Sequence, residues 1–349
     1  MRVVKAGFAP IIEKDPIKKI ERVARVCYKS EDKIAKGTDM KMVDMLINRK
    51  HYAMLEHASL CYIVSESVYY EVVEIIGDYM HFAHEEDKSA GKRFKMIPKI
   101  KYTEYNTGKE TRFVVSGNLR AWIELFEWVE EYSRDSYWPD AIVSLHNSVR
   151  LDTKCMVSFT DKEKFMSTHY TNFNNKCSVV LVTDYSVLSP DERMIHETFS
   201  ILFTVDRGVT HEIVRMRECS FAQESTRYCN YLLGKFGEEI AVIHPCFFLD
   251  VNSTEFEIWK HSCEVAENDY LALLRLGATP QQARDVLPTS VKADIVVTTN
   301  LIEWRHIFEL RACDATGPAH PQMKEVMIPA LESLQKEYDF AFGALVPAR

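Results

Sequence analysis

The sequence predicts a globular protein that combines α-helices with β-strands. Three observations support this prediction. Apolar residues make up 46% of the chain and charged residues 27%, as in ordinary soluble proteins. Segments with helical spacing of apolar residues alternate with short apolar runs typical of strands. No Gly-, Ser- or Pro-rich linker interrupts the 349 residues, which favours one compact domain over separated modules.

Composition and charge exclude several classes of protein. The chain has 43 Lys and Arg against 51 Asp and Glu, a formal net charge of −8, so we expect no nucleic-acid partner. No apolar run approaches the roughly 20 residues of a membrane span, and the first residues lack the apolar run of a secretory signal. The nine cysteines form no Cys-x-x-Cys pair. This favours reduced thiols in the cytoplasm over a disulfide framework or a zinc site, and we expect no metal and no membrane partner.

The N-terminal half contains both kinds of element. Apolar residues recur at helical spacing over residues 17–29 and 40–48, and the apolar run 60–64 is typical of a buried strand. Residues 78–112 are rich in charge and poor in pattern, so we interpret them as a surface excursion. Residues 162–178 are polar and are expected to form a loop.

The C-terminal half has clearer boundaries. Residues 201–205 predict a strand that is followed by a turn at residues 206–208. Residues 255–276 predict a helix that ends at Gly277, a natural C-terminal cap. Capping boxes mark two further helix starts: Thr279 opens a short helix that ends near Pro288, and Asn300 with Glu303 opens a helix from Leu301 to about Ala312, after a strand at 295–297.

Two segments of the chain resemble each other. FVVSGNLRAWIELFEW (113–128) and IVVTTNLIEWRHIFEL (295–310) share identical residues at matched positions, among them Asn, Leu, Trp, Phe and Glu, and both predict a strand, a polar turn and an amphipathic helix. We favour an ancient duplication; the alternative is two similar units that match by chance. The sequence therefore predicts a single domain over residues 1–349, with an insertion or partial internal duplication at about residues 77–193.

The most informative segment is DRGVTHEIVRMRECSFAQESTRYCNY, residues 206–231. It contains four arginines and no lysine, and a guanidinium binds phosphate or carboxylate through two parallel hydrogen bonds. The segment therefore predicts an anion-binding site. The alternative is a buried network of salt bridges with Glu212, Glu218 and Glu224.

Three further candidates lie on the predicted C-terminal helices. Arg284 and Arg311 each follow an apolar stripe, so each either joins a site or extends its side chain along the surface. His306 is a lone helical histidine, a position that is more often structural than functional. The chain has no dinucleotide-binding glycine fingerprint, no P-loop, no serine-nucleophile elbow and no HExxH zinc motif.

The arginine-rich segment also resembles a known family. Arg215-Met216-Arg217, seven residues, then Ser225 is similar to the signature of the flavin-dependent thymidylate synthases, which reads Arg-His-Arg, seven residues, Ser. The resemblance covers about residues 20–76 and 194–345. Further similar segments are ARVCYKS (24–30), HYAMLEHASL (51–60), the stretch 283–311 and AHPQM (319–323).

The resemblance implies an α+β fold with a mixed sheet flanked by helices, assembled as a homotetramer with shared active sites. It implies the reductive methylation of dUMP at C5 to dTMP. The carbon comes from 5,10-methylenetetrahydrofolate, and FAD reduced by NADPH supplies the hydride. The resemblance also implies that the enzyme needs no cysteine nucleophile. Its arginines are expected to bind the nucleotide phosphate and to stabilise negative charge on the uracil ring.

The resemblance also implies site residues. Arg311 and Ser225 are the candidate catalytic residues, with Arg311 polarising the pyrimidine. The backbone around Glu224 and Ser225 is expected to meet the phosphate. The nucleotide site is expected to consist of Glu212, Arg215, Gln223, Glu224, Ser225, Arg227, Arg284 and Arg311, and the flavin site of Arg217, Asn300, His306 and His51.

Two positions depart from the family pattern. Met216 stands where the family has His, and Ile302 where it has Arg; neither side chain can donate the hydrogen bonds that those residues offer on the flavin side. In the repeat, the counterpart of Ile302 is Arg120. Besides the synthase itself, two alternatives stay open: a related methylase or hydroxymethylase of another pyrimidine nucleotide, and a non-catalytic nucleotide-binding paralogue.

Overall fold

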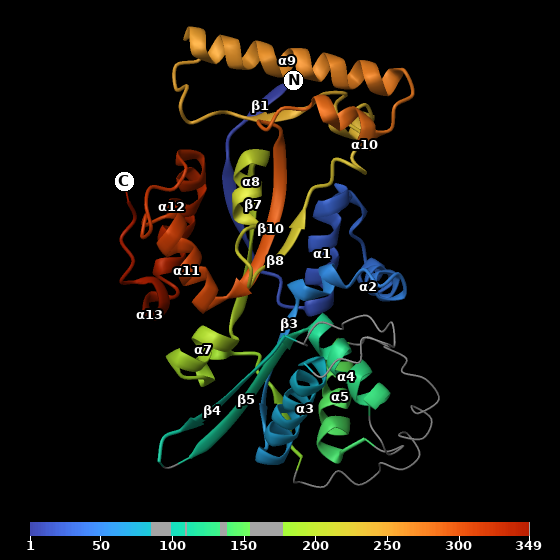
Figure 1. Cartoon of the computed structure of the whole chain (residues 1–349), viewed down its shortest axis with the longest axis vertical. Helices are drawn as coiled ribbons and strands as arrows, with labels where there is room; N and C mark the ends of the chain where they lie inside the picture. The colour runs from blue at the N-terminus through green and yellow to red at the C-terminus, as the bar shows by residue number, and fades with distance from the viewer. Residues whose placement is uncertain (85–98, 109, 133–137, 154–176, 349) are drawn as a thin grey trace. The chain divides into compact units, whose positions relative to one another are not determined.

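The computed structural model describes residues 1–84, 99–108, 110–132, 138–153 and 177–348. The chain divides into two compact units that are not consecutive in sequence (Figure 1). Unit 1 consists of Met1–Glu13, Glu21–Ala35 and Thr198–Arg349, and unit 2 of Lys14–Ile20 and Lys36–Glu197. No helix of the described residues is long and apolar enough to cross a membrane.

Unit 1 contains a four-stranded antiparallel sheet with the strand order β2-β7-β10-β8. Its long central strands are β7 (Thr198–Asp206) and β10 (Lys292–Asn300), and its edge strands are β2 (Gly7–Ile11) and β8 (Ser220–Gln223). A separate parallel pair joins β1 (Arg2–Val4) to β9 (Ala241–Ile243). Parallel and antiparallel pairing therefore occur in different sheets, and the expected mixed sheet is wrong for the described strands.

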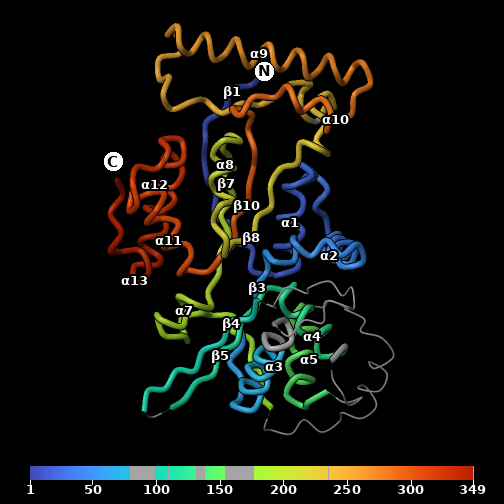
Figure 2. The backbone as a smooth tube through the Cα atoms, viewed as in Figure 1, coloured from blue at the N-terminus to red at the C-terminus, as the bar shows by residue number. Residues whose placement is uncertain are grey.

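Helices flank the strands of unit 1. The helix α8 (Arg207–Ile213) lies against β7 and β10, while α9 (Thr254–Arg275) packs on the β1–β9 pair through residues such as Cys263 and Tyr270 (Figure 2). The remaining elements are α1 (Pro16–Tyr28, divided between the two units), α10 (Pro280–Ala283), α11 (Leu301–Arg311), α12 (Pro321–Gln335), α13 (Asp339–Phe342) and short 3-10 turns at Glu31–Lys33, Gly234–Phe236 and Arg284–Val286.

The core of unit 1 is aromatic where α11 meets the sheet. Trp304 is fully buried and stacks on Phe199 of β7 at a centroid distance of 5.0 Å and on Phe308 at 5.5 Å. Its indole nitrogen donates to the carbonyl oxygen of Phe199 at 3.3 Å, so this large side chain is buried with its polar atom satisfied. These contacts fix α11 on the sheet, and with it the position of Arg311.

Unit 2 contains a second four-stranded antiparallel sheet with the order β4-β5-β3-β6. Its strands are β3 (Ser59–Val64), β4 (Ile100–Asn106), β5 (Thr111–Asn118) and β6 (Val179–Leu181). Its helices are α2 (Thr38–Asn48), α3 (Glu66–His84), α4 (Leu119–Tyr132), α5 (Asp140–Thr153) and α7 (Pro190–His196), with 3-10 turns at Tyr52–His57 and Tyr185–Val187.

Most of the predicted elements are confirmed. The helices predicted at 17–29, 40–48 and 255–276 form as α1, α2 and α9 (Thr254–Arg275), within two residues of the predicted bounds, and the strands predicted at 60–64 and 201–205 lie within β3 and β7. Both helix starts with polar caps are also confirmed: Thr279 forms the capping box, and the Asn300 side chain accepts a hydrogen bond from the backbone N–H of Glu303.

The interpretation of residues 78–112 as a surface excursion is wrong where the structure describes them. They contain the end of α3, all of β4 and the start of β5. Because β4 is an edge strand, its outward positions carry charged and polar residues, which hides the apolar alternation in the sequence. Residues 85–98, and residues 162–176 of the predicted loop, lie outside the described residues.

Acid is expected to destabilise unit 2 through His196. Its buried ring has Ser116 Oγ at 2.7 Å from Nδ1 and Thr103 Oγ1 at 2.8 Å from Nε2, and burial lowers its pKa from 6.5 to about 4. The unfolded chain therefore takes up the proton first, so stability is full above pH 6.5 and falls as the pH drops toward 4. The loss of unfolding free energy from this group is about 2 kcal/mol at pH 5.

Urea unfolding at pH 7 and pH 5 measures this loss, and His196→Gln should show a smaller pH dependence. An equal pH dependence in both proteins would contradict the assignment.

Candidate active site

Strand β7 leads the chain directly into the arginine-rich segment. Its last residue, Asp206, caps α8, because its Oδ1 accepts a hydrogen bond from the Val209 N–H at 2.8 Å. A Cβ atom at Gly208 would lie 2.9 Å from that Oδ1, so glycine keeps the cap close. The predicted turn at residues 206–208 is therefore wrong. Asp serves helix caps as readily as turns, and here it starts a helix.

Three arginines of the predicted anion-binding segment, together with Arg284, are exposed and lack ion pairs in the described part of the chain. Arg215, Arg217, Arg227 and Arg284 all have exposed side chains, and none of them is paired with a carboxylate of the described residues. The alternative of a buried salt-bridge network is therefore wrong for Arg215, Arg217 and Arg227, whereas Arg207, the fourth arginine of the segment, is half-buried and donates to the Glu224 carbonyl at 3.0 Å. Arg227 lies over the ring of Tyr228, with its guanidinium carbon 5.6 Å from the ring centroid. Four unpaired guanidinium groups are available to an anionic ligand.

Arg311 at the end of α11 is placed differently. Its side chain is 24% exposed, and its Nη1 lies 3.7 Å from Glu212 Oε2. Its Nε is buried without a hydrogen-bond partner among the described residues, and its side chain lines a small apolar cavity together with Met216. A buried donor without a partner costs free energy until an acceptor arrives. The structure thus brings Arg311 and Glu212 together, and it places a guanidinium where burial strengthens its field.

Two other predicted nucleotide residues, Gln223 and Ser225, have hydrogen-bond partners nearby, a side chain in the first case and the backbone in the second. Gln223 ends β8 and donates from Nε2 to Thr210 Oγ1 at 3.0 Å. Ser225 follows it, and its Oγ accepts a hydrogen bond from the Arg227 N–H at 3.3 Å. Both side chains keep further hydrogen-bonding capacity for a ligand.

Glu224 does not fit the role expected for it. Its side chain is 1% exposed and points into the protein. Its N–H donates to the Asp294 carbonyl at 2.8 Å, and the N–H of Ser225 donates to the Cys27 carbonyl at 3.0 Å. Neither backbone donor is open to a phosphate, because each already has a backbone acceptor. The expectation that the backbone here meets the phosphate is corrected accordingly.

The predicted flavin residues are only partly brought together. Arg217 and His306 lie in unit 1 with exposed side chains and without ion pairs in the described part of the chain. Asn300 is buried, and its side chain caps α11. His51 is exposed and belongs to unit 2. Of the two departures, Met216 is buried against apolar neighbours and Ile302 is 47% exposed.

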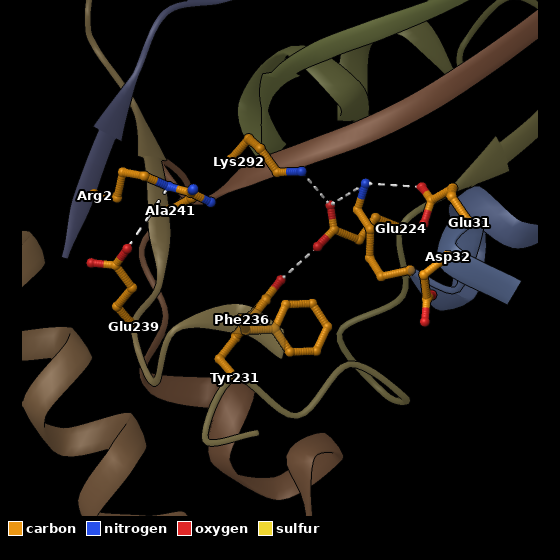
Figure 3. Close-up of a pocket in the computed structure, with 10 residues that line it drawn as sticks. Arg2, Glu31, Asp32, Glu224, Tyr231, Phe236, Glu239, Ala241 and Lys292 are labelled. Carbon is orange, nitrogen blue, oxygen red and sulfur yellow. Dashed lines mark hydrogen bonds and ion pairs between the residues drawn. The ribbon is translucent and has the colours of Figure 1, made fainter. Parts of the chain in front are cut away.

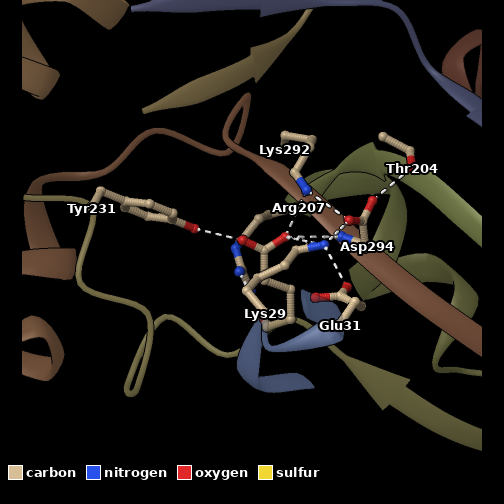
Figure 4. A network of polar contacts seen from close by, with 8 residues as sticks. Lys29, Glu31, Thr204, Arg207, Tyr231, Lys292 and Asp294 are labelled. Atoms are coloured by element: carbon tan, nitrogen blue, oxygen red, sulfur yellow. Dashed lines mark hydrogen bonds and ion pairs between the residues drawn. The ribbon is translucent and has the colours of Figure 1, made fainter. Parts of the chain in front are cut away.

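Sequence reasoning missed a buried charged network beside the arginine segment (Figure 4). Lys292 Nζ lies 2.8 Å from Glu224 Oε2 and 2.8 Å from Asp294 Oδ2, and Lys29 Nζ pairs with the same Asp294 oxygen. Tyr231 donates to Glu224 Oε1 at 3.1 Å. One signal was available: Lys292 and Asp294 alternate in a strand whose other members are apolar or uncharged, so their charges share one face.

A cavity of about 410 Å³ opens beside this network (Figure 3). The charged residues Lys29, Lys292 and Glu224 line it, together with the aromatic residues Tyr231 and Phe236. The remaining lining residues are Arg2, Glu31, Asp32, Glu239 and Ala241.

Comparison with known proteins agrees with the resemblance seen in the sequence. The family described as thymidylate synthase complementing protein matches residues 161–338. The flavin-dependent thymidylate synthase of Pyrococcus abyssi is 35% identical over 144 residues, which is 40% of this chain and 56% of that protein. That of Corynebacterium efficiens is 31% identical over 147 residues, 40% of this chain and 58% of that protein.

Among solved structures, the chain is similar to the UMP/dUMP methylase PolB of Streptomyces cacaoi bound with 5-Br dUMP. The identity is 24%, the TM-score is 0.34, and the match covers 43% of this chain and 74% of that one. The chain thus spans little more than half the length of the curated relatives it matches.

The family match covers just over half of the chain and contains the whole of residues 206–231, together with β10 and α11. It therefore includes each unit 1 residue of the candidate site. On this match the chain belongs to the thymidylate synthase complementing protein family, the family of the flavin-dependent thymidylate synthases.

Proposed function

We propose that this protein is a flavin-dependent thymidylate synthase that methylates dUMP at C5 to give dTMP. The observation that carries the proposal is the set of exposed arginines without ion pairs around residues 206–231. Unpaired guanidinium groups bind a phosphate through charge-assisted hydrogen bonds without first breaking an internal ion pair. We place the activity in the cytoplasm, since the eight described cysteines are all free thiols.

Each nucleotide residue has a separate part in this proposal. Arg215, Arg227 and Arg284 bind the phosphate, with Ser225 Oγ as a further donor. Gln223 and Glu212 offer acceptors to the pyrimidine. Arg311 stabilises negative charge on the ring as the carbon is added, and its partly buried position strengthens that effect.

The residues proposed to bind the flavin support their role less completely than the nucleotide residues support theirs. FAD reduced by NADPH would supply the hydride, and 5,10-methylenetetrahydrofolate the carbon. The exposed, unpaired Arg217 and His306 fit an anionic cofactor. Asn300 keeps its cap and can offer its amide N–H₂. His51 stays in the proposed flavin set on the family alignment alone. We also propose the homotetramer with shared sites that the family implies.

The test is the visible absorption spectrum of the purified protein, followed by release of any chromophore. A yellow protein with stoichiometric FAD, and tritium release from C5-labelled dUMP in the presence of folate and NADPH, is the expected result. A folded, flavin-loaded protein without tritium release would refute the synthase. A colourless protein that binds dUMP but takes up no FAD would make it a nucleotide-binding paralogue.

One observation favours a second candidate function. Met216 and Ile302 remove two hydrogen-bonding side chains from the flavin side, which can change the chemistry or the pyrimidine accepted. The second candidate is therefore a methylase or hydroxymethylase of another pyrimidine nucleotide. Product masses from a panel of pyrimidine monophosphates separate the two, since exclusive use of dUMP removes the second.

We also propose that the two units are diverged copies of one ancestral unit. In unit 2, Ser59 of β3 pairs with Asn118 of β5, and in unit 1, Thr198 of β7 pairs with Asn300 of β10. Each asparagine side chain then accepts from the N–H three residues on, at the start of a helix. The matched Trp122 and Trp304 are both fully buried.

This proposal predicts one nucleotide site per chain. The helix α8 has seven residues and ends before Arg215, whereas its counterpart α3 has 19 residues and contains neither arginine nor lysine. Within the described residues, α3 therefore supplies no guanidinium or ammonium group to a phosphate. Calorimetric titration with dUMP should give a stoichiometry near one per chain, and a value near two would contradict the prediction.

A further inference from the structure

Four charged side chains meet inside unit 1: Lys29, Lys292, Glu224 and Asp294, here called the quartet. Figure 4 shows Lys29, Lys292 and Asp294 close together. Their side chains are between 1% and 18% exposed. Each lysine contacts both carboxylates, with Lys29 Nζ at 3.8 Å from Glu224 Oε2. The two positive and two negative charges cancel, as buried charges require.

Two members of the quartet, Asp294 and Lys29, have pKa values that their partners shift toward the charged form. Burial alone would raise the pKa of Asp294, but Lys292 and Lys29 together hold it at about 2. Burial alone would lower the pKa of Lys29, but Glu224 and Asp294 raise it above its usual value. The ion pair between Lys29 and Asp294 is therefore charged at neutral pH.

Lys29 occupies a backbone conformation that lysine rarely adopts. It directly follows α1 with a φ of 46°, in the left-handed region that favours glycine. Such strain persists only where the surroundings hold the residue in place. Here the ammonium group is held by Asp294, so the side chain explains why lysine occupies this position.

Hydrogen bonds from several other elements hold the backbone and side chain around Glu224 in place. From β10, the Asp294 N–H donates to Glu224 Oε2 at 3.3 Å; from α8, Arg207 Nη2 donates to the Glu224 carbonyl at 3.0 Å. The hydrogen bond from Ser225 to Cys27 adds the end of α1. The two neighbours of Glu224 in the chain are Gln223 and Ser225, both assigned above to the nucleotide.

We propose that the quartet is a lock that holds residues 223–227 in the conformation that binds the nucleotide. Glu224 is thereby a positioning residue, which acts through Gln223, Ser225 and Arg227 and does not touch the substrate. This role rests on the proposed function. It explains why a glutamate inside the arginine segment points away from the exposed guanidinium groups.

The test uses the double variant Glu224→Gln/Lys292→Met, which removes one charge of each sign and leaves the quartet neutral. The control is Glu218→Gln, in the same segment, where the glutamate is exposed and has no ion pair among the described residues. Hydrogen exchange of the amides of Ser225, Tyr228 and Cys229 should rise at least tenfold in the double variant. It should stay unchanged in the control and in β7 of both proteins.

The dUMP dissociation constant is the second measurement. It should rise 10- to 50-fold in the folded double variant, and stay within twofold of wild type in Glu218→Gln and within threefold in Lys292→Arg. Unchanged exchange, or faster exchange with unchanged dUMP affinity, overturns the lock. A wild-type protein that binds no dUMP at all refutes the proposed function instead. If the double variant does not fold, Lys29→Gly, which suits the left-handed backbone, is tested by the same criteria.

Discussion

Arg311→Ala is expected to lower kcat/KM for dUMP methylation about 10²- to 10³-fold, the usual effect of removing one preorganised donor from a developing negative charge. The structure gives the reason. The guanidinium is only 24% exposed, and its Nε has no acceptor among the described residues. A charge that builds up on the pyrimidine ring would find a donor that is already desolvated. Tritium release from C5-labelled dUMP measures the effect.

Two further variants separate charge from geometry. Arg311→Lys keeps the charge but loses the planar fork, so an intermediate activity is expected. Arg275→Ala is the matched control, because Arg275 also ends a helix, α9, but is exposed and has no partner in the described residues. Its activity should stay within twofold of wild type. Full activity in Arg311→Ala would remove Arg311 from the chemistry.

The sequence predicts the anion site well because its signal is local. Four arginines without lysine lie within 21 residues of each other, and residue type alone indicates phosphate chemistry. The structure supports that interpretation for Arg215, Arg217 and Arg227, whose side chains are exposed and have no ion pair among the described residues, whereas Arg207 is half-buried and holds the Glu224 carbonyl. The quartet could not be found this way, because Lys29 and Asp294 are 265 positions apart in the chain. Only the pairing of β8 with β10 brings Glu224 beside Asp294.

The bounds of strand β10 also depend partly on local sequence and partly on contacts with distant residues. The apolar triplet 295–297 predicts only the centre of β10, which extends from Lys292 to Asn300. Its polar ends belong to the strand because β7 pairs with its whole length. Thr298 and Thr299 are buried there, with hydroxyl partners in Ser200 and in the Glu218 carbonyl. Tertiary pairing, and not local propensity, decides such residues.

The division into units is hidden from the sequence for a different reason. No linker composition marks it, because the chain enters unit 2 and returns to unit 1 through ordinary elements. The repeat at 113–128 and 295–310 was the one local sign that two units of similar construction exist. It marks only the β5–α4 and β10–α11 pairs, while β3 and β7 share too few residues to be matched by sequence alone.

Arg227→Ala is expected to weaken dUMP binding by about 1.5–3 kcal/mol, or roughly 10- to 150-fold in the dissociation constant. The residue is exposed and unpaired, and its guanidinium lies over Tyr228 at 5.6 Å, which limits the conformations it loses on binding. Arg227→Lys keeps the charge without the fork, so a smaller loss is expected. Calorimetric titration at fixed ionic strength gives both values.

Titration with a second ligand, deoxyuridine, tests whether the affinity lost in Arg227→Ala comes from a contact between Arg227 and the phosphate. Deoxyuridine lacks the phosphate but keeps the ring and the sugar, so its affinity should be the same for wild type and Arg227→Ala. The difference between the two ligands then isolates the coupling of Arg227 to the phosphate, since any general damage to the site affects both equally. If deoxyuridine binding falls as much as dUMP binding, Arg227 shapes the site without contacting the phosphate, and the phosphate must be bound by Arg215 and Arg284.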